Sequence, residues 1–497
     1  MQRRIAELRL CILGILAVVL VAFPPRVVAQ TANASGGTAG MATPTFTEDV
    51  APILYDHCVR CHRPNGAAPM SLVTYDQAKK YAPLIKYRTG LFPKQGTMPP
   101  YYLERNVGIQ QYSDDVRLTE DQIATLAAWA DAGAPEGDAA KMPPRPDLSS
   151  DEGWTIHPDI IVKSNDLFME GGHPDWWGEI DPIPIPLDED RYVKAVQVRE
   201  VNDVPKEGTG GGTHVGGRWI VHHMIYHTEA ENDEGKKEVT PWPVHELGRN
   251  ADIFDPDGGP LLAAHSEIVS NSVHMHSNGR DTHANLLIGF ELFPKGYKPK
   301  YKRARLALGD GQNLDVPARS EGESTEFHAY AALKHNVKFQ TFEPHLHVPG
   351  ERMCLEYIWG TMRETLSCVG YDHNWVKQYT FKPGYEPLIP KGAIVHIVGY
   401  NNNTKSNAEI PDPRNWQGSG NRSVQNMFID LGRQLQLTDE QFKEAMEERV
   451  RERGLTKNDH VVGCPLCLAT IPTPGPKPRE AMKAKTGQQD DDQGGRQ

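Results

Sequence analysis

The pattern of apolar and polar positions changes once along the chain, near residue 154. Before it, FTEDVAPILYDHC places Asp49 and its neighbours at a helix start, and in LTEDQIATLAAWADAG Thr119 caps a helix that Gly133 ends. After it, short β-type runs such as YVKAVQV, NLLIGFEL, VKFQTFEPHLH and AIVHIVGYNNN are separated by clusters of Gly, Pro, Asn and Asp. Many short strands with regular turn residues are typical of β-sandwiches. We therefore predict a small all-α unit followed by two mainly antiparallel, jelly-roll-like β-sandwich domains.

One predicted strand, IVHHMIYHT, carries two adjacent histidines, His222 and His223, among apolar residues. Neighbouring side chains on a pleated strand point to opposite faces. The two imidazoles can therefore share one ligand only where the strand bends or ends, and we predict a local irregularity there. His227, further along the same strand, is interpreted as a neighbour or a hydrogen-bonded core residue.

The N-terminus is typical of an exported protein. A basic start (MQRRIAELRL) precedes an apolar core (CILGILAVVLVAF) and a small-residue pattern that ends at Ala29, which predicts a cleavable signal peptide. A membrane anchor is the alternative, but an apolar run of about 14 residues is short for a span that needs about 20. We expect a periplasmic or otherwise exported protein with no stable membrane span after cleavage. The net charge of −12, without a Lys/Arg-rich block, excludes nucleic acid as a partner.

A short motif in the helical unit predicts a covalent haem. DHCVRCHRP contains Cys58, Cys61 and His62 in the C-x-x-C-H arrangement, in which two thiols add to the haem vinyl groups and the histidine is the proximal ligand. A disulfide followed by a chance histidine is the alternative. Met98 in GTMPPYY, held by the two prolines that follow it, is the preferred sixth ligand; Met70 in GAAPMSL and an open site are the other two interpretations. A Met/His pair raises the reduction potential and suits electron transfer.

Further histidines gather in the β-rich part of the chain. VHMHSNG supplies His274 and His276, EPHLHVPG supplies His345 and His347, and NRSVQNMFIDLG supplies Met427. Three imidazoles suit a copper ion that cycles between Cu(I) and Cu(II), and an added thioether favours Cu(I). Zinc competes for sites of three histidines, but a methionine ligand argues against it. The pattern therefore predicts redox-active copper.

With these residues, positions 155 to 435 resemble the type II copper, ascorbate-dependent monooxygenase family, which includes peptidylglycine alpha-hydroxylating monooxygenase and dopamine beta-monooxygenase. The resemblance implies two linked β-sandwich domains, each with one copper ion beside a solvent cleft. The His-His-Met motif matches positions 222–224. One copper would be held by His222, His223 and His274, with His276 as the alternative third ligand, and the other by His345, His347 and Met427.

One departure from the family concerns the substrate. The peptide-amidating members hold the substrate carboxylate with an arginine and a tyrosine, and the matching positions here are Glu343 and Leu431. A carboxylate at Glu343 would repel another carboxylate. We therefore expect a small organic substrate that is neutral, cationic or otherwise different from a peptide carboxylate. His328, His335 and His396 are interpreted as structural.

The remaining cysteines are expected to form disulfides. Cys354 and Cys368 lie symmetrically around Thr361, so a hairpin that turns at 360–362 would place them opposite each other. Cys464 and Cys467 have no following histidine, which excludes haem attachment there. A local disulfide is the preferred interpretation of this pair, and a metal half-site with His460 is the alternative.

At 497 residues, the chain is long enough for about three domains. The expected organisation is a signal peptide at 1–29, a flexible spacer at 30–45, a cytochrome c domain at 46–139, a Pro-rich linker at 140–153, copper monooxygenase-like β-sandwiches at 154–315 and 316–435, a helix and C-x-x-C segment at 436–475, and a disordered tail at 476–497.

These expectations lead to one functional hypothesis and two alternatives. The leading hypothesis is an exported copper monooxygenase with two copper ions and one haem c. It would use O2, with electrons from the haem, another redox protein or an ascorbate-like reductant. The first alternative is a non-catalytic periplasmic electron-transfer or copper-binding protein. In the second, only the cytochrome functions and the β-rich part is an adhesive module.

Overall fold

The computed structural model describes residues 43–64, 68, 70–146, 153–204, 218–231, 234–247, 249, 251–305, 307–310, 314–318, 322–410, 412–420 and 425–472. The expected signal peptide, nearly all of the spacer, much of the Pro-rich linker and the expected tail lie outside the described residues. Among the described helices, none is long and apolar enough to cross a membrane.

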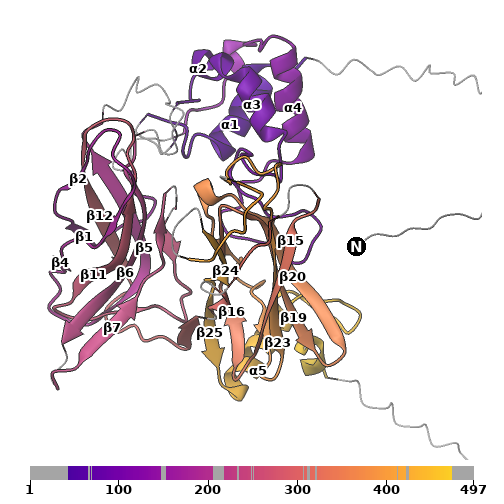
Figure 1. The fold of residues 1–497 in the computed structure, drawn as a ribbon. Helices are drawn as coiled ribbons and strands as arrows, with labels where there is room; N and C mark the ends of the chain where they lie inside the picture. Colours follow the sequence, from indigo (N-terminus) through magenta and orange to yellow (C-terminus); the bar gives the residue numbers. More distant parts are fainter. Residues whose placement is uncertain are drawn as a thin grey trace, which may run out of the picture. The chain divides into compact units, whose positions relative to one another are not determined.

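The first described part of the chain is helical (Figure 1). Its elements are the π-helical turn η1 (Phe46–Val50), α1 (Ala51–His57), α2 (Tyr75–Lys80), α3 (Ala82–Thr89), α4 (Glu120–Asp131) and the 3₁₀ turn η2 (Ala139–Lys141). Thr119 accepts a hydrogen bond from the backbone of Gln122, whose side chain bonds back to it, so the predicted cap of α4 is confirmed. The buried side chains of Leu126 and Trp129 pack α4 against the core that contains Phe46.

A first β region follows, and it consists of two six-stranded antiparallel sheets. Its strands are β1 (Ile160–Lys163), β2 (Leu167–Met169), β3 (Trp176–Gly178), β4 (Ile183–Pro184), β5 (Arg191–Asn202), β6 (Val221–Glu231), β7 (Lys237–Pro241), β8 (His245–Glu246), β9 (Asp252–Ile253), β10 (Leu261–Leu262), β11 (Glu267–Met275) and β12 (Thr282–Leu292). One sheet runs β1-β12-β5-β10, with β2 beside β12 and β9 beside β5. The other runs β3-β11-β6-β7, with β4 beside β11 and β8 beside β6. Apolar residues of both sheets share one core, which makes this region a β-sandwich.

A second β region contains smaller antiparallel sheets. Its strands are β13 (Lys302–Arg305), β14 (Leu308–Asp310), β15 (Thr325–Ala332), β16 (Asn336–Phe339), β17 (Thr341–Phe342), β18 (Pro344–His347), β19 (Gly350–Trp359), β20 (Met362–Gly370), β21 (Tyr379–Thr380), β22 (Leu388–Ile389), β23 (Ile394–Asn401), β24 (Asn426–Asp430) and β25 (Arg433–Leu437). The sheets run β13-β25-β16-β22, β14-β24-β18, β15-β23-β19-β20 and β17-β21. Because β13 and β14 pair with β25 and β24, these two strands belong with this region, and the boundary lies before the expected residue 315.

The cysteine pairs are disulfide-bonded as their spacing predicts. Cys354 in β19 faces Cys368 in β20 directly across the ladder. Cys464 and Cys467 close a short loop after the helix α5 (Asp439–Glu452), and Cys467 begins the 3₁₀ turn η4 (Cys467–Thr470). His460 instead lies beside Glu364, 2.8 Å from its carboxylate, which leaves the cysteine pair as a plain disulfide.

Part of the expected all-α unit is not helical and packs on the second β region. Leu103 forms an isolated antiparallel bridge with Val369, and Tyr112 forms another with Phe381. The side chains of residues 101, 103, 109 and 112 are buried in the main core of that region. Burial of these apolar groups against β20 and residues 379–381 outweighs any helical preference, so the unit is only partly α-helical.

Candidate metal centres

Two strands bring together a first histidine group, which consists of His222, His223 and His274. In the ladder between β6 and β11, His223 pairs with His274 and Val221 pairs with Met275, so His222 is an extra residue without a partner in the ladder. Such a bulge bends the strand and re-aims its side chains. The irregularity predicted at the adjacent histidines is therefore confirmed.

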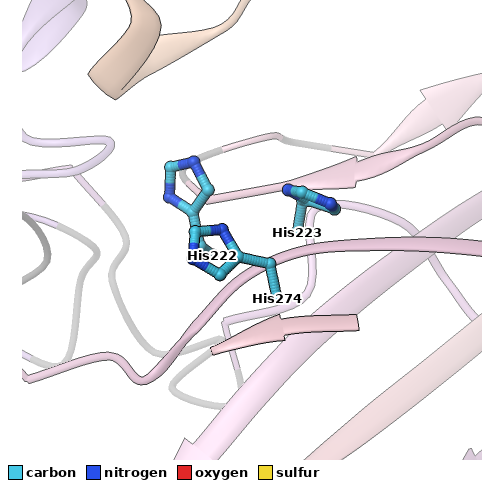
Figure 2. A group of neighbouring side chains, drawn as sticks. All are labelled: His222, His223 and His274. Atoms are coloured by element: carbon cyan, nitrogen blue, oxygen red, sulfur yellow. The ribbon is translucent and has the colours of Figure 1, made fainter. Parts of the chain in front are cut away.

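The three side chains lie close enough to share one ion (Figure 2). One ring nitrogen of each lies within 4.8 Å of the others. Two nitrogens bound at about 2.0 Å from a metal ion lie up to about 4 Å apart. The three histidine side chains therefore need to move only slightly to bind one ion. His276, the alternative third ligand, lies nearby, with its ring centre 5.4 Å from that of His222 and 6.1 Å from that of His274, but it is not among the three residues whose ring nitrogens lie within 4.8 Å of one another.

Neighbouring groups hold the His274 ring in place. The indole of Trp177 in β3 stacks on it, with ring centres 3.7 Å apart and an angle of 9° between the planes. The Asp175 carboxylate lies 2.9 Å from Nε2 of His274. Carboxylates in this position commonly orient the histidine ligands of metals, because they fix which ring nitrogen carries the proton.

The electrostatics of the group favour neutral imidazoles. Burial, with a contribution from His274, lowers the pKa of His223 to about 3, and burial lowers the pKa of His222 well below its usual value. Nδ1 of His222 is buried and has no hydrogen-bond partner among the described residues. Neutral imidazole is the form that binds metals, and a buried lone pair without a donor is costly unless an ion takes it. The donor set therefore fits a metal ion.

A second histidine group, His345 and His347, lies in β18. Their ring centres are 4.9 Å apart, and Leu346 between them is fully buried in the core on the other face. His347 adopts a left-handed backbone conformation, with φ of 62°. This conformation is uncommon outside glycine, costs on the order of 1–3 kcal/mol and concentrates at functional sites. The backbone N–H of His347 donates to the hydroxyl of Tyr371, 3.3 Å away, which helps to fix this conformation.

Met427 lies on β24, the strand beside β18. His345 pairs with Ile429 and His347 pairs with Asn426, so one extra residue lies on β24 between these partners. Met427 is half-buried within this irregular stretch. The ladder thus brings the methionine to the strand next to both histidines, as a shared metal site would require.

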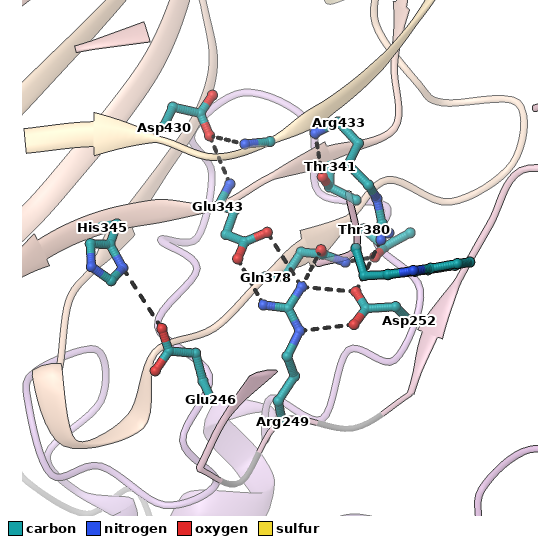
Figure 3. Close-up of polar contacts among 12 residues, drawn as sticks. Glu246, Arg249, Asp252, Thr341, Glu343, His345, Gln378, Thr380, Asp430 and Arg433 are labelled. Atoms are coloured by element: carbon teal, nitrogen blue, oxygen red, sulfur yellow. Dashed lines mark hydrogen bonds and ion pairs between the residues drawn. The ribbon is translucent and has the colours of Figure 1, made fainter. Parts of the chain in front are cut away.

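A carboxylate of the first β region reaches the second histidine group. Oε1 of Glu246 in β8 lies 4.0 Å from Nδ1 of His345 (Figure 3). Burial raises the pKa of Glu246 to about 8, although the charge of Arg249 opposes this rise. Burial, with His347 and His373, lowers the pKa of His345 well below its usual value. His345 is therefore also a neutral imidazole.

His373 connects the two groups, and no sequence pattern predicts this role. It begins the 3₁₀ turn η3 (His373–Trp375), and its ring centre lies 5.7 Å from that of His222 and 5.4 Å from that of His347. Burial and the nearby imidazole of His347 lower its pKa to about 3. A single histidine in YDHNW has no motif partner and follows no periodic pattern, so only the folded chain assigns it to the cluster.

The expectation that Glu343 faces a substrate is corrected. Its carboxylate is buried and accepts hydrogen bonds from Arg249, at 2.7 Å from Nη1 and 3.4 Å from Nη2 (Figure 3). Arg249 also bonds to Asp252, which pairs with Arg433 at 3.0 Å. Glu343 therefore belongs to an ionic network between the two β regions and is not available to repel a substrate carboxylate. Leu431 bonds to the carbonyl of Glu343 through its backbone N–H.

The other histidines contact protein groups. Both ring nitrogens of His227 have polar neighbours, Asn271 at 2.7 Å and Glu229 at 2.8 Å. His328 and His396 lie 2.9 Å apart, and His396 also contacts a glutamate at 2.9 Å. His335 is exposed.

The C-x-x-C-H motif follows α1 directly. Cys58 and Cys61 are free thiols, whereas the other four described cysteines are paired. Nδ1 of His62 lies 3.1 Å from the carbonyl oxygen of Met70. Burial lowers the pKa of His62, so its ring is neutral. A proton on Nδ1 donated to this carbonyl leaves the Nε2 lone pair for a ligand.

Comparisons with known proteins do not assign a family. No protein-family model and no curated protein matches the chain. It aligns with a candidate alpha-L-fucosidase from Bacteroides ovatus ATCC 8483 at 11% identity, over 63% of this chain and 43% of that chain, with a TM-score of 0.16. It aligns with the N-terminal tandem of CBM22 domains from Paenibacillus barcinonensis at 8% identity, over 56% and 98% of the two chains, with a TM-score of 0.15. Scores this low carry no argument about fold or function.

Proposed function

We propose that this chain is an exported copper-dependent monooxygenase that hydroxylates an organic substrate with O2 and receives electrons through a fused c-type haem. The observation that carries the proposal is the compact set of His222, His223 and His274, whose ring nitrogens lie within 4.8 Å of one another. The second histidine group lies near it, joined by the ring of His373.

The donor atoms of each site favour copper. His222, His223 and His274 would hold one ion, and His345, His347 and Met427 would hold the other. Copper bound there supplies one-electron redox chemistry and reactivity toward O2. Burial keeps the imidazoles of His222, His223 and His345 neutral. The thioether of Met427 would favour the reduced state at the second site.

The side chains around these ligands would set their orientation. Asp175 and Trp177 fix the ring of His274, and the bulge at His222 turns two successive imidazoles toward one ion. Glu246 lies near His345. Ligands held in advance lose less conformational entropy when the ion binds, which favours affinity and a defined geometry.

The same reasoning supports one covalent haem on the helical part of the chain. The free thiols of Cys58 and Cys61 would attach it and His62 would be its proximal ligand. The Met70 carbonyl lies beside Nδ1 of His62, the nitrogen that would face away from iron. This position favours Met98 over Met70 as the distal ligand. The two disulfides suit an oxidising compartment, in which such a haem is attached.

Two measurements test the function. Metal analysis of the purified protein should find two copper ions and one haem iron per chain. The copper-loaded, reduced protein should then consume O2 when a panel of small organic substrates is presented. His274→Ala should abolish this consumption, whereas His335→Ala, which alters an exposed histidine, should not. Iron without copper would overturn the proposal.

The second candidate function is a non-catalytic electron carrier or copper-binding protein. It is favoured by the closeness of the two histidine groups, since linked metal sites also suit electron storage. Full copper and haem content with no O2 consumption against any substrate would favour this function over the monooxygenase.

A further inference from the structure

The turn that contains His373 contacts the candidate copper ligands on one side. The His373 ring centre lies 5.7 Å from His222 in the first β region and 5.4 Å from His347 in the second. Its Nε2 is buried and has no hydrogen-bond partner among the described residues. His373 is therefore in reach of ligands from both predicted copper ions, although no ligand motif contains it.

The preceding residue, Asp372, holds the loop that carries the predicted distal haem ligand. Its Oδ2 accepts hydrogen bonds from the backbone N–H of Gly96 and from the hydroxyl of Tyr102, each at 3.0 Å. These two residues flank Met98. Its Oδ1 accepts from the backbone N–H of Asn374 at 3.0 Å, which fixes the turn that contains His373. One buried carboxylate thus ties the methionine loop to the His373 turn.

Further contacts make this connection rigid. The backbone N–H of Tyr102 donates to the hydroxyl of Tyr379 at 3.2 Å. The Tyr102 side chain is almost fully buried, and burial together with Asp372 raises its pKa, so the hydroxyl keeps its proton and donates.

We propose that Asp372 and His373 form the bridge through which electrons pass from the haem to the copper ions. The proposal rests on the proposed function and names the residues that connect its two kinds of cofactor. One electron leaves the ferrous haem iron, which becomes ferric, and reduces one Cu(II) to Cu(I). No bond forms or breaks and no proton moves. An external one-electron donor, a small redox protein, restores the ferrous haem.

Electron transfer through Asp372 and His373 is favoured because these residues form an almost continuous path of bonds. Electrons tunnel more readily along covalent and hydrogen bonds than across gaps between non-bonded atoms. From the methionine loop, the path crosses one hydrogen bond from Gly96 to Asp372 and then follows covalent bonds to the His373 ring. Only the contacts between imidazole rings remain before the predicted copper ligands.

The bridge is tested by flash photoreduction of the copper-loaded haem protein without O2. A light-excited donor reduces the haem, and haem absorbance then follows its reoxidation by Cu(II). Wild-type protein should show a reoxidation phase that disappears when copper is removed. His373→Ala should slow this phase several-fold or more, and the milder Asp372→Asn should slow it less. The exposed control His335→Ala should match the wild type.

Copper content, the Cu(II) EPR spectrum and the haem spectrum are measured on each variant to show that both cofactors are present. Wild-type rates in His373→Ala and Asp372→Asn, with full cofactor content, would overturn the bridge. So would a wild-type protein that contains both cofactors but has no copper-dependent phase. In either case O2 consumption with a chemical reductant could still occur, so the monooxygenase proposal would stand. A protein without copper would instead remove the proposed function.

Discussion

Replacing Arg249 by methionine should strongly destabilise the contact between the two β regions. Its guanidinium bonds to Glu343 at 2.7 Å, to Asp252 at 2.8 and 3.0 Å, and to Gln378 at 2.6 Å. The side chains of Arg249, Asp252 and Glu343 are at most 8% exposed. Removal of one partner from such a buried pair costs about 3–5 kcal/mol, because a charge remains without compensation. Asp252 keeps Arg433 at 3.0 Å, so the lower half of this range is expected.

The loss of stability in Arg249→Met should depend on pH because of Asp252. Burial raises its pKa, but the charges of Arg249 and Arg433 outweigh burial and hold the pKa below its usual value. A depressed folded-state pKa contributes stability that is present above the unfolded pKa and is lost as the pH falls through the folded pKa. The difference in the free energy of unfolding between Arg249→Met and the wild type should therefore be largest at pH 7 and should become smaller below about pH 4.

The assay is a urea titration of both proteins, followed by tryptophan fluorescence. Arg249→Lys should lose less stability than Arg249→Met, because it keeps the charge but not the planar fork. Arg414→Met is the matched control. Arg414 is exposed and pairs with Asp412, so this variant should unfold as the wild type does. If Arg249→Met changes stability by less than about 1 kcal/mol, the network does not hold the regions together and the reasoning fails.

Three further predictions concern the copper site, a buried carboxylate and a disulfide. Trp177→Ala should weaken copper binding at the first histidine group about 10-fold, because the stacked ring orients His274; an unchanged dissociation constant in a copper titration would contradict this. Burial raises the pKa of Asp430 to about 6, so the contribution of this carboxyl group to stability should fall by about 2 kcal/mol as the pH rises from 4 to 6, and Asp430→Asn should remove that part of the slope in urea titrations. An identical slope in the variant would exclude this role. Replacing Cys354 and Cys368 by serine should cost about 3 kcal/mol, because the disulfide closes a loop with a sequence separation of 14; an unchanged unfolding midpoint would refute this.

Exposed residues of the same types serve as controls for these substitutions. Trp416 is 64% exposed, so Trp416→Ala should leave copper binding unchanged. Asp412 is on the surface, and Asp412→Asn should not alter the slope of stability between pH 4 and 6.

The sequence by itself determined those features whose signals lie within a few residues of one another along the chain. Alternating apolar runs gave the strands, Thr119 and its glutamine partner gave the start of α4, and the symmetric spacing of Cys354 and Cys368 gave their disulfide. The irregularity at His222 was also predictable, because adjacent side chains on a regular strand cannot face one ion.

The tertiary structure alone decided which distant groups meet. The charge of Glu343 is balanced by Arg249, which lies 94 positions earlier in the chain, and no local sequence pattern predicts that pairing. His373 joins both histidine groups because η3 lies where the two β regions meet, and residues 101–112 leave the helical part because their apolar side chains fill a β core. Periodicity and spacing report the face that a residue occupies on its own element. The partner on that face depends on how whole elements pack, and this is set by burial over the entire chain.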